Sequence, residues 1–216
     1  MTTLAWLLLG IAAAAALVNW YAVGGATRHG RLEFAAKPAT LLALVGVALA
    51  LTPTDTTVRA LFVAALVLSL IGDVALMLPR ERFVGGLVSF LLAHLAYLVG
   101  LGIIVARQGS VVGAIVGLGL AGLVLASVGR RVVAAMRTTY PRLLGPVVAY
   151  MVVISTMLVV AFATGRPLAL AGATLFYTSD ATLAWNRFVE RRRWGRLAVI
   201  TTYHLGQALL VLSLVT

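Results

Sequence analysis

The sequence predicts an all-α integral membrane protein, folded as a single bundle of eight transmembrane helices, and three observations support this prediction. Of the 216 residues, 62% are hydrophobic and 11% are charged, whereas a soluble domain is less apolar and about twice as charged. The apolar residues form long runs that end at charges or at glycine and proline. The basic residues gather in alternate loops. We therefore expect residues 1–216 to form one multi-pass domain in a cell membrane, namely a bacterial inner membrane.

Eight apolar segments follow from cutting the chain at charges and at Gly/Pro clusters. Their approximate ranges are 3–24, 38–52, 58–78, 83–106, 111–128, 143–164, 167–186 and 197–215. The first segment lacks the basic stretch of a signal peptide, so we predict a retained helix. The second has about 15 residues, which predicts a tilted or partly inserted helix, or a locally thinned bilayer. Gly165-Arg166-Pro167 predicts a tight reversal between the sixth and seventh segments.

Loop charges predict the orientation of the bundle, because short cytoplasmic loops are enriched in lysine and arginine. With eight spans, alternate loops fall on one side. One side holds fourteen basic residues, namely Arg28, Arg31, Lys37, Arg80, Arg82, Arg130, Arg131, Arg137, Arg142, Arg187, Arg191, Arg192, Arg193 and Arg196. The other side holds Arg59, Arg107 and Arg166. We therefore predict cytoplasmic basic loops, with the N- and C-termini outside.

Composition and motifs exclude several classes of function. The net charge of +11 comes from short loops between apolar runs, so no nucleic-acid partner is predicted. Cysteine is absent, which excludes disulfides and thiolate metal sites. The usual serine-hydrolase motifs and a glycine-rich phosphate loop are also missing from the sequence. Nothing in the sequence implies a protein partner.

Two carboxylates, Asp73 and Asp180, lie inside apolar segments. A charge there costs roughly 2.5–3.5 kcal/mol on insertion scales and marks a functional site by default. Both segments run from outside to cytoplasm, and each aspartate should lie roughly 8–9 Å below the inner surface. Two carboxylates at one level can share a cavity and form an acid/base couple, because they cannot both ionise easily. The alternative is structural: each aspartate bonds across helices or pairs with Lys37 or an arginine.

Further polar residues converge on this layer. Asn19, Lys37, Ser69, Tyr177, His204 and Gln207 are predicted near it, with His94 and Tyr97 closer to the membrane centre. For His94, a hydrogen bond that bridges helices is as plausible as a chemical role. Asp73, Asp180, His94 and His204 could in principle ligate a metal. However, the sequence has no HExxH-type spacing and no two histidines on one helical face, so neither a metal nor another cofactor is predicted.

These residues occur in blocks that resemble the YhhN/TMEM86 family of membrane proteins. The blocks are Lys37-Pro38-Ala39-Thr40, residues 70–78 around Asp73, residues 83–97 with His94, residues 172–184 with Asp180, Asn186-Arg187-Phe188, and residues 202–207. Each block alone is weakly specific, but their order and spacing together are specific and cover most of the chain. One departure is Gly206, because family members commonly have alanine before the glutamine.

The resemblance implies an eight-helix fold and the activity of the characterised members, which are lysoplasmalogenases. These hydrolyse the vinyl ether bond of a lysoplasmalogen to a fatty aldehyde and a glycerophospho-alcohol. It maps the two catalytic aspartates onto Asp73 and Asp180, acting by carboxyl acid/base catalysis. The expected substrate-binding residues are Lys37, His94, Tyr97, Tyr177, Asn186, Tyr203 and Gln207. A lysophospholipid from the inner leaflet would keep its phosphate near Lys37, Arg80 or Arg187.

Two other functions stay open at this point. The chain could be a lipid-binding protein or a proton-coupled small-molecule transporter that uses the same aspartates. It could also be a different membrane hydrolase, with or without a metal, acting on a lipid amide or ester.

Overall fold

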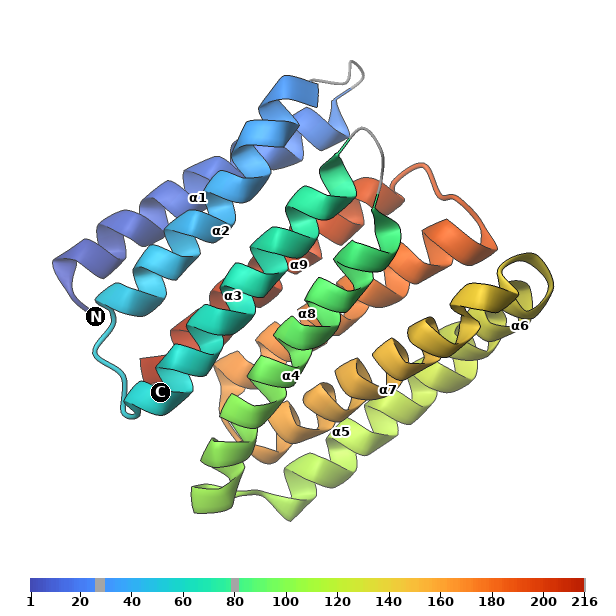
Figure 1. Ribbon diagram of the computed structural model, residues 1–216. Coiled ribbons are helices and arrows are strands. Elements are labelled where there is room, and N and C mark those ends of the chain that lie inside the picture. Colours follow the sequence, from blue (N-terminus) through green and yellow to red (C-terminus); the bar gives the residue numbers. More distant parts are fainter. Residues whose placement is uncertain (26–29, 79–81, 216) are drawn as a thin grey trace.

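The computed structural model describes residues 1–25, 30–78 and 82–215, and the regular elements within these ranges are all helical (Figure 1). The helices are α1 (Thr3–Gly24), α2 (Gly30–Ala50), α3 (Thr56–Met77), α4 (Phe83–Gln108), α5 (Val111–Val124), α6 (Arg130–Thr139), α7 (Pro141–Ala163), α8 (Pro167–Ala184) and α9 (Gly195–Leu212). Two π-helical turns, η1 (Leu125–Gly129) and η2 (Trp185–Val189), continue α5 and α8, and the 3₁₀ turn η3 (Ser213–Val215) ends α9.

Local sequence signals account for several helix ends. Asp55 accepts hydrogen bonds from two backbone N–H groups of the first turn of α3, at 2.7 and 3.0 Å. Ser110 accepts one from the first turn of α5 at 3.0 Å, and such caps satisfy N–H groups that have no partner within the helix. The tight reversal between α7 and α8 is confirmed: Gly165 has a φ of 66°, which glycine adopts without a clash of Cβ.

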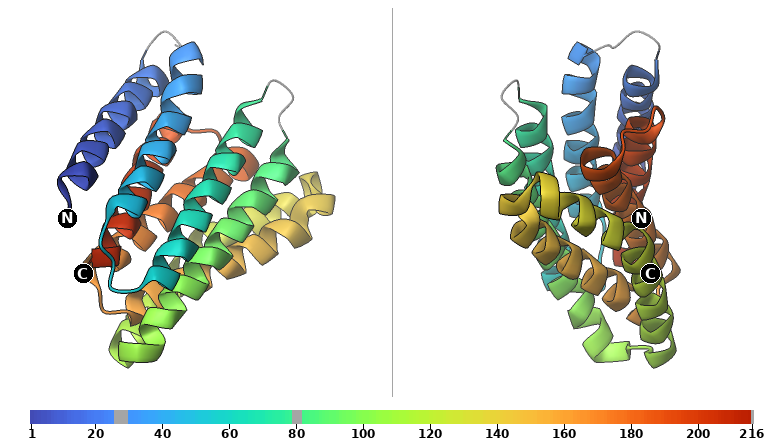
Figure 2. Two further views of the ribbon diagram at one scale, coloured as in Figure 1. Left: turned by 60° about the vertical axis from the view of Figure 1, so that its left-hand side comes forward. Right: turned by 90° about the vertical axis from the view of Figure 1, so that its right-hand side faces the viewer.

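The helices pack as antiparallel neighbours, with α1–α2, α3–α4 and α8–α9 as the most extensive pairs. Helix α7 packs between α4 and α5. Helices α8 and α9 lie behind α3 and α4 in Figure 1 and to one side of them in the right-hand view of Figure 2. Both termini lie at one end of the bundle, together with the α2–α3, α4–α5 and α7–α8 connections. Helices α1, α3 and α8 end at the opposite end of the bundle, where α6 also lies.

The bundle is apolar outside and carries polar side chains inside, as expected of helices in lipid. Val111 and Val112 of α5 are 76% and 72% exposed, whereas Asp73, His94 and Gln207 are buried. Within the described ranges, seven helices are long and apolar enough to cross a membrane, counting α5, η1 and α6 as one. Helix α8 is not among them, because polar residues around Asp180 lower its hydropathy. The chain is thus a multi-pass membrane protein.

Helix α2 is longer than the sequence predicted. It begins at Gly30 and has 21 residues, so the expected short segment over 38–52 is wrong. The charged stretch before Pro38 stays helical because its charges find partners on other helices: Glu33 lies 2.7 Å from Arg196, and Lys37 lies 2.7 Å from Asp73. Pro38 itself lies inside α2, where it removes one backbone N–H.

The basic stretch between the fifth and sixth segments is also helical, not a loop. Helix α5 continues through η1 into α6, and Arg142 is the second residue of α7. Helix α6 is amphipathic: Val132 and Met136 are buried against Val147 and Phe188, while its arginines are exposed. Cutting at charges missed this helix because its apolar residues recur on one face rather than in a run.

Candidate active site

Asp73 lies near the end of α3 in a buried ion pair. Its carboxylate is 2.7 Å from the amine of Lys37 on α2, and it accepts a hydrogen bond of 2.9 Å from the hydroxyl of Tyr203 on α9. The side chain of Asp73 is 1% exposed and that of Lys37 is 15% exposed. Because an unpaired charge is costly away from water, these contacts hold three helices together at one carboxylate.

One turn before Asp73, a second set of hydrogen bonds joins α3, α4 and α9. Gln207 donates through Nε2 to the hydroxyl of Ser69 at 3.0 Å, and its Oε1 accepts from the hydroxyl of Tyr97 at 2.5 Å. All three side chains are buried. Buried polar groups that satisfy one another specify a single arrangement of helices, so this set positions the Asp73 region.

Asp180 lies near the end of α8, where α4 and α7 meet it. The hydroxyl of Tyr150 on α7 donates a hydrogen bond to Oδ2 of Asp180, and Nε2 of His94 on α4 lies 3.6 Å from the same oxygen. The ring of His94 also packs against Tyr150 and Phe176, with centroids 5.2 and 4.7 Å apart. The Asp180 side chain is 13% exposed, so it is more accessible than Asp73.

The hydrogen bond of His94 to the backbone fixes where its proton lies. Nδ1 is 2.6 Å from the carbonyl oxygen of Phe90, and because a carbonyl only accepts, Nδ1 carries the hydrogen. In a neutral ring Nε2 is then a bare acceptor, and among the described residues it has no hydrogen-bond partner. Two acceptors that face each other at 3.6 Å repel unless a proton lies between them. A proton on either group would turn this repulsion into attraction, but at 3.6 Å the two atoms form no hydrogen bond.

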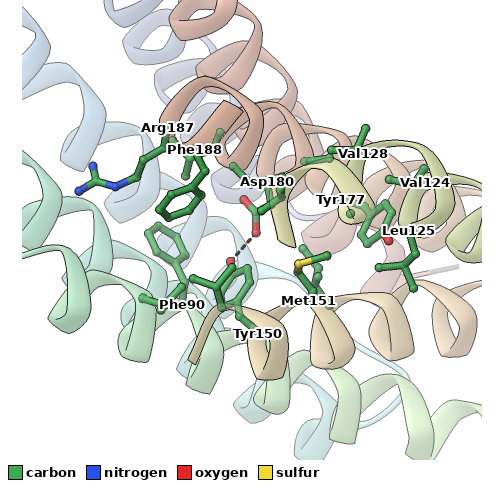
Figure 3. Close-up of a pocket in the computed structure, with 18 of the residues that line it drawn as sticks. Phe90, Val124, Leu125, Val128, Tyr150, Met151, Tyr177, Asp180, Arg187 and Phe188 are labelled. Atoms are coloured by element: carbon green, nitrogen blue, oxygen red, sulfur yellow. Dashed lines mark hydrogen bonds between the residues drawn. The ribbon is translucent and has the colours of Figure 1, made fainter. Parts of the chain in front are cut away.

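An apolar cavity opens beside Asp180 (Figure 3). Its cavity volume is about 80 Å³, below the range of about 300–1,000 Å³ for pockets of drug-sized ligands, so it is a narrow slot that fits a chain rather than a bulky group. Its polar lining residues are Asp180, Tyr150, Tyr177 and Arg187. Figure 3 shows Tyr177 on one side of Asp180 and Arg187 on the other. Asp73 is not on this wall.

The two aspartates lie at matching places but in different surroundings. Asp73 and Asp180 each lie four residues before the last residue of their helices, Met77 and Ala184, at the same end of the bundle. Their carboxylates are close enough to interact electrostatically. Phe176 packs against Tyr203 on the Asp73 side and against His94 on the Asp180 side. We predicted that the two carboxylates share one cavity. In the structure only Asp180 lines the cavity, and aromatic rings connect it to the Asp73 side.

The predicted substrate-binding residues fall into four groups. Lys37, Tyr203, Gln207 and Tyr97 surround Asp73 or the hydrogen bonds beside it, and His94 contacts Asp180. Tyr177 lines the cavity and shares a hydrogen bond of 2.9 Å with Ser155. Asn186, in η2, accepts from the backbone N–H of Arg192 at 2.9 Å, away from both carboxylates. Arg80 lies outside the described residues. Their roles toward a substrate stay predictions.

Histidine and carboxylate groups are dispersed. Within the described ranges, no three His, Asp or Glu side chains come together as metal ligands would. Asp73 is occupied by Lys37, and Nδ1 of His204 accepts from the indole N–H of Trp20 at 3.2 Å. The chemistry of the site described above is thus that of carboxyl, phenol and imidazole groups.

Tyr150 is the site residue that sequence reasoning missed. It lies in the apolar segment 143–164, and only the packing of α7 against α8 brings its hydroxyl to Asp180. A polar side chain inside an apolar helix is a signal that could have found it. That signal does not say which neighbouring helix the side chain faces.

The sequence matches the YhhN family over residues 32–214. The chain belongs to the YhhN family. Among the relatives of this YhhN-family protein, lysoplasmalogenase TMEM86B from Sus scrofa is 36% identical over 150 residues, which is 69% of this chain and 61% of the relative. The same protein is 36% identical in Rattus norvegicus and 32% identical in Homo sapiens, each over 149 residues and 69% of this chain.

The match covers 59% of the Rattus norvegicus protein and 61% of the Homo sapiens protein. The chain therefore spans about three fifths of the length of the curated relatives it matches. No solved structure matches the chain.

Proposed function

We propose that this YhhN-family protein is a membrane hydrolase that cleaves the vinyl ether bond of a lysoplasmalogen. The observation that carries the proposal is Asp180 on the wall of an apolar cavity, with Tyr150 and His94 both at its Oδ2 atom. An apolar cavity suits an alkenyl chain, and Asp180 is the one carboxylate that the described residues contribute to its lining. The relatives named lysoplasmalogenase support the substrate class.

The reaction needs an acid, water and a base in succession. A carboxylic acid donates its proton to the carbon β to the ether oxygen, and the double-bond electrons form the new C–H bond. The resulting oxocarbenium ion accepts water at the α carbon, while the carboxylate takes up the proton of that water. The hydroxyl group of the hemiacetal then loses its proton, and the bond between the α carbon and the glycerol oxygen breaks. The glycerol oxygen takes up a proton, which leaves the fatty aldehyde and the glycerophospho-alcohol. One water is consumed, and the carboxyl group regains its starting state.

We assign the acid and base steps to Asp180. It lines the cavity, where a proton on its carboxyl group would be available for donation. Tyr150 donates to the same oxygen, so it orients the carboxyl group and stabilises the carboxylate formed after donation. This division of roles resembles the general acid of glycosidases, which also generate an oxocarbenium-like species.

We assign Asp73 a role through position. Its carboxylate interacts electrostatically with that of Asp180, while Lys37 at 2.7 Å offsets its charge. Through Tyr203 and Phe176 it also supports the ring of His94. Asp73 is therefore a positioning residue in this proposal.

We further propose eight membrane spans, with α8 among them, the basic end in the cytoplasm and both termini outside. The support is that both termini lie at the end of the bundle opposite to the α8–α9 connection, which contains Arg191, Arg192 and Arg193. Lysine and arginine collect on the cytoplasmic side of membrane proteins. A lysolipid would then reach Asp180 from the cytoplasmic leaflet.

Aldehyde release by the purified protein in detergent tests the function. Alkenyl and acyl lysophospholipids with the same headgroup are compared, and we expect aldehyde from the alkenyl lipid and no fatty acid from the acyl lipid. Detergent removes any membrane gradient, so a proton-coupled transporter would release nothing. Equal turnover of the acyl lipid would contradict vinyl ether specificity.

Asp180→Asn and Asp73→Asn are both expected to abolish turnover, for different reasons. Asp180→Asn removes the proton donor while its amide can still accept from Tyr150. Asp73→Asn leaves Lys37 buried without a counter-ion, which costs roughly 3–5 kcal/mol of stability. Both variants should be checked for folding by thermal melting in detergent.

The double variant Lys37→Met with Asp73→Asn separates folding from chemistry at Asp73, because it removes both charges at once. We expect its melting temperature to exceed that of Asp73→Asn, with turnover still abolished. Wild-type turnover in a folded double variant would show that Asp73 is dispensable. Wild-type turnover in Asp180→Asn would reject Asp180 as the acid.

A further inference from the structure

The cavity beside Asp180 continues sideways into a groove between α5 and α8. The groove is lined by Thr178 and Thr182 of α8, by Trp185 and Asn186 of η2, and by Arg192 and Trp194 of the following loop. The cavity and the groove share four lining residues, Val124, Val128, Tyr177 and Ala181, so they adjoin. Helix α5 packs on α7 and has few contacts with α8, which leaves this flank of the bundle open. We call this feature the α5–α8 groove.

Two guanidinium groups flank Trp185 at the outer end of the α5–α8 groove: Arg192 lines the groove, and Arg131 lines an adjoining hollow. Arg131 of α6 and Arg192 lie over the indole ring of Trp185, 5.4 and 5.7 Å from its centroid. Arg192 also lies 3.3 Å from Glu190 in an exposed pair, and such pairs contribute little. The hollow contains Arg130 and Arg131 and adjoins Trp185. Glu190 offsets only one of the charges of Arg130, Arg131 and Arg192. The remaining positive charge suits an anionic group of a ligand.

The distance from this basic end to Asp180 matches one part of a lysophospholipid. Trp185 follows Asp180 by five residues, which is about 7.5 Å along a helix. In a lysophospholipid the ether oxygen is separated from phosphorus by five bonds, roughly 6 Å when extended. A phosphate at Arg131 and Arg192 would therefore bring the ether bond to Asp180, with the chain in the cavity.

Other cations near the aspartates fit this role less well. Lys37 is held by Asp73 at 2.7 Å. Arg187 packs over the ring of Phe83 at 3.9 Å, and Figure 3 shows it on the opposite side of Asp180 from Val124, Val128 and Tyr177. The α5–α8 groove thus combines an open flank, a basic end and a connection to the cavity.

We propose that the α5–α8 groove is the lateral entry path and the phosphate-binding subsite for a single-chain phospholipid. The phosphate binds Arg131 and Arg192 beside Trp185, the glycerol lies along Ala181, and the chain passes between Val128 and Tyr177 into the cavity. The identity of this ligand rests on the proposed function, but its binding can be measured without turnover.

Equilibrium binding of a lysophospholipid with a saturated ether in place of the vinyl ether tests the phosphate subsite. This probe cannot be hydrolysed by the proposed reaction, and a 1-O-alkylglycerol of the same chain length serves as its phosphate-free counterpart. We expect Arg131→Gln and Arg192→Gln each to weaken binding of the lysophospholipid by about fivefold, the effect of one surface guanidinium on an anionic headgroup. Binding of the alkylglycerol should be unchanged in both variants.

Arg193→Gln is the matched control, because Arg193 is exposed, neighbours Arg192 and lines neither the cavity, the groove nor the hollow that contains Arg131. It should bind the lysophospholipid as the wild type does. Wild-type affinity in the Arg131→Gln, Arg192→Gln double variant would overturn the subsite. Equal losses for the lysophospholipid and the alkylglycerol would overturn it as well.

A pair of threonine substitutions tests the entry path. Thr178 and Thr156 are both exposed, and each hydroxyl bonds the carbonyl four residues earlier, at 2.8 and 2.9 Å. Thr178 lines the groove, whereas Thr156 lies on α7 and lines neither the groove nor the cavity. We expect Thr178→Trp to slow association of the probe at least fivefold and Thr156→Trp to leave it unchanged. Equal rates in the two variants would overturn the entry path.

Failure of this proposal is distinguishable from failure of the proposed function. Normal aldehyde release with unaltered binding in the arginine variants contradicts the groove alone. Arginine-dependent binding of the probe without aldehyde release from a vinyl ether contradicts the hydrolase alone.

Discussion

Oδ2 of Asp180 receives contacts from two helices, and its surroundings differ from those of Asp73 in one respect that bears on chemistry. Asp73 is matched by a full positive charge on Lys37, so its carboxylate has a permanent partner. Asp180 instead contacts the phenol of Tyr150 and Nε2 of His94, whose ring hydrogen lies on the other nitrogen, Nδ1. Neither partner supplies a fixed charge, so the protonation of Asp180 can change during a reaction at low cost.

Tyr150→Phe tests this arrangement at the residue scale. The substitution removes the hydroxyl but keeps the ring that packs against His94. Because a hydrogen bond to a charged group contributes about 1.5–3 kcal/mol, we expect kcat for aldehyde release to fall about tenfold to hundredfold. KM should change little, since the hydroxyl serves the carboxyl group rather than the lipid. Tyr140→Phe, at the exposed end of α6, should keep wild-type kinetics. An unchanged kcat in Tyr150→Phe would reject its role.

At the scale of elements, two glycines set the distance between α8 and α9. A Cβ on Gly206 would lie 2.9 Å from both the carbonyl oxygen of Gly172 and the backbone nitrogen of Phe176. These are backbone atoms of α8, which cannot turn away as a side chain can.

Gly206→Ala is therefore expected to destabilise the protein by roughly 1–3 kcal/mol through overpacking. It should also lower turnover, because α8 carries Asp180 and Phe176. Gly119→Ala is the matched control, since a Cβ there would meet nothing within 4 Å, and alanine favours a helix by up to about 1 kcal/mol. Thermal melting in detergent compares the two variants. A Gly206→Ala protein as stable as Gly119→Ala would contradict the close packing.

Asp55 joins the start of α3 to the end of α4. It caps α3 and lies 2.5 Å from Arg107. The backbone N–H of Val58 and then the guanidinium of Arg107 hold the pKa of Asp55 below its ordinary value. A lowered pKa in the folded state means that stability is present above the ordinary pKa. It is lost as the pH falls through the folded value, below about pH 4.

Asp55→Asn separates the cap from the charge, because asparagine caps helices about as well as aspartate. We expect the fall in melting temperature between pH 6 and about pH 2.5 to be smaller in Asp55→Asn than in the wild type. Asp55→Ala should lose the cap and be less stable already at pH 6. Glu190→Gln, which alters an exposed pair, should follow the wild-type profile. The same acid sensitivity in Asp55→Asn as in the wild type would contradict the contribution of Asp55.

At the scale of the whole molecule, the crossing of α8 decides whether the bundle has eight spans. The chain contains no cysteine, so single cysteines can be placed freely. Pro167 is exposed at the start of α8, and Arg193 is exposed in the connection after it. We expect Pro167→Cys to react with a membrane-impermeant maleimide in intact cells, and Arg193→Cys to react only after permeabilisation. Labelling of both from one side would show that α8 does not cross.

Much of the fold could be predicted from hydropathy because the lipid environment acts on each helix separately. Helix α1 coincides with the predicted segment 3–24, and the remaining seven segments each overlap a helix. The starts of α2 and α6 were missed because a charged stretch can be helical when its charges find partners on other helices, as Lys37 does at Asp73. Those partners are distant along the chain, so a local sequence pattern does not identify them.

The site was predictable in part for the same reason. A carboxylate in an apolar run is costly wherever the run lies in the bundle, and this cost singled out Asp73 and Asp180 before any helix was placed. The cost does not reveal which partner satisfies each carboxylate. Tyr150, the ring of Phe176 and the α5–α8 groove all depend on how neighbouring helices are rotated against one another.

Hydropathy and charge along the chain thus suffice to predict an all-helical membrane protein. They also suffice to predict two aspartates near one end of the bundle whose burial in lipid costs free energy. They suffice because burial in lipid and the cost of a charge are properties of single segments. Packing alone decided that Asp73 is bound to Lys37 while Asp180 faces the cavity. The physical reason is that a cavity or an ion pair exists only between helices, where glycine contacts and hydrogen bonds set the distances.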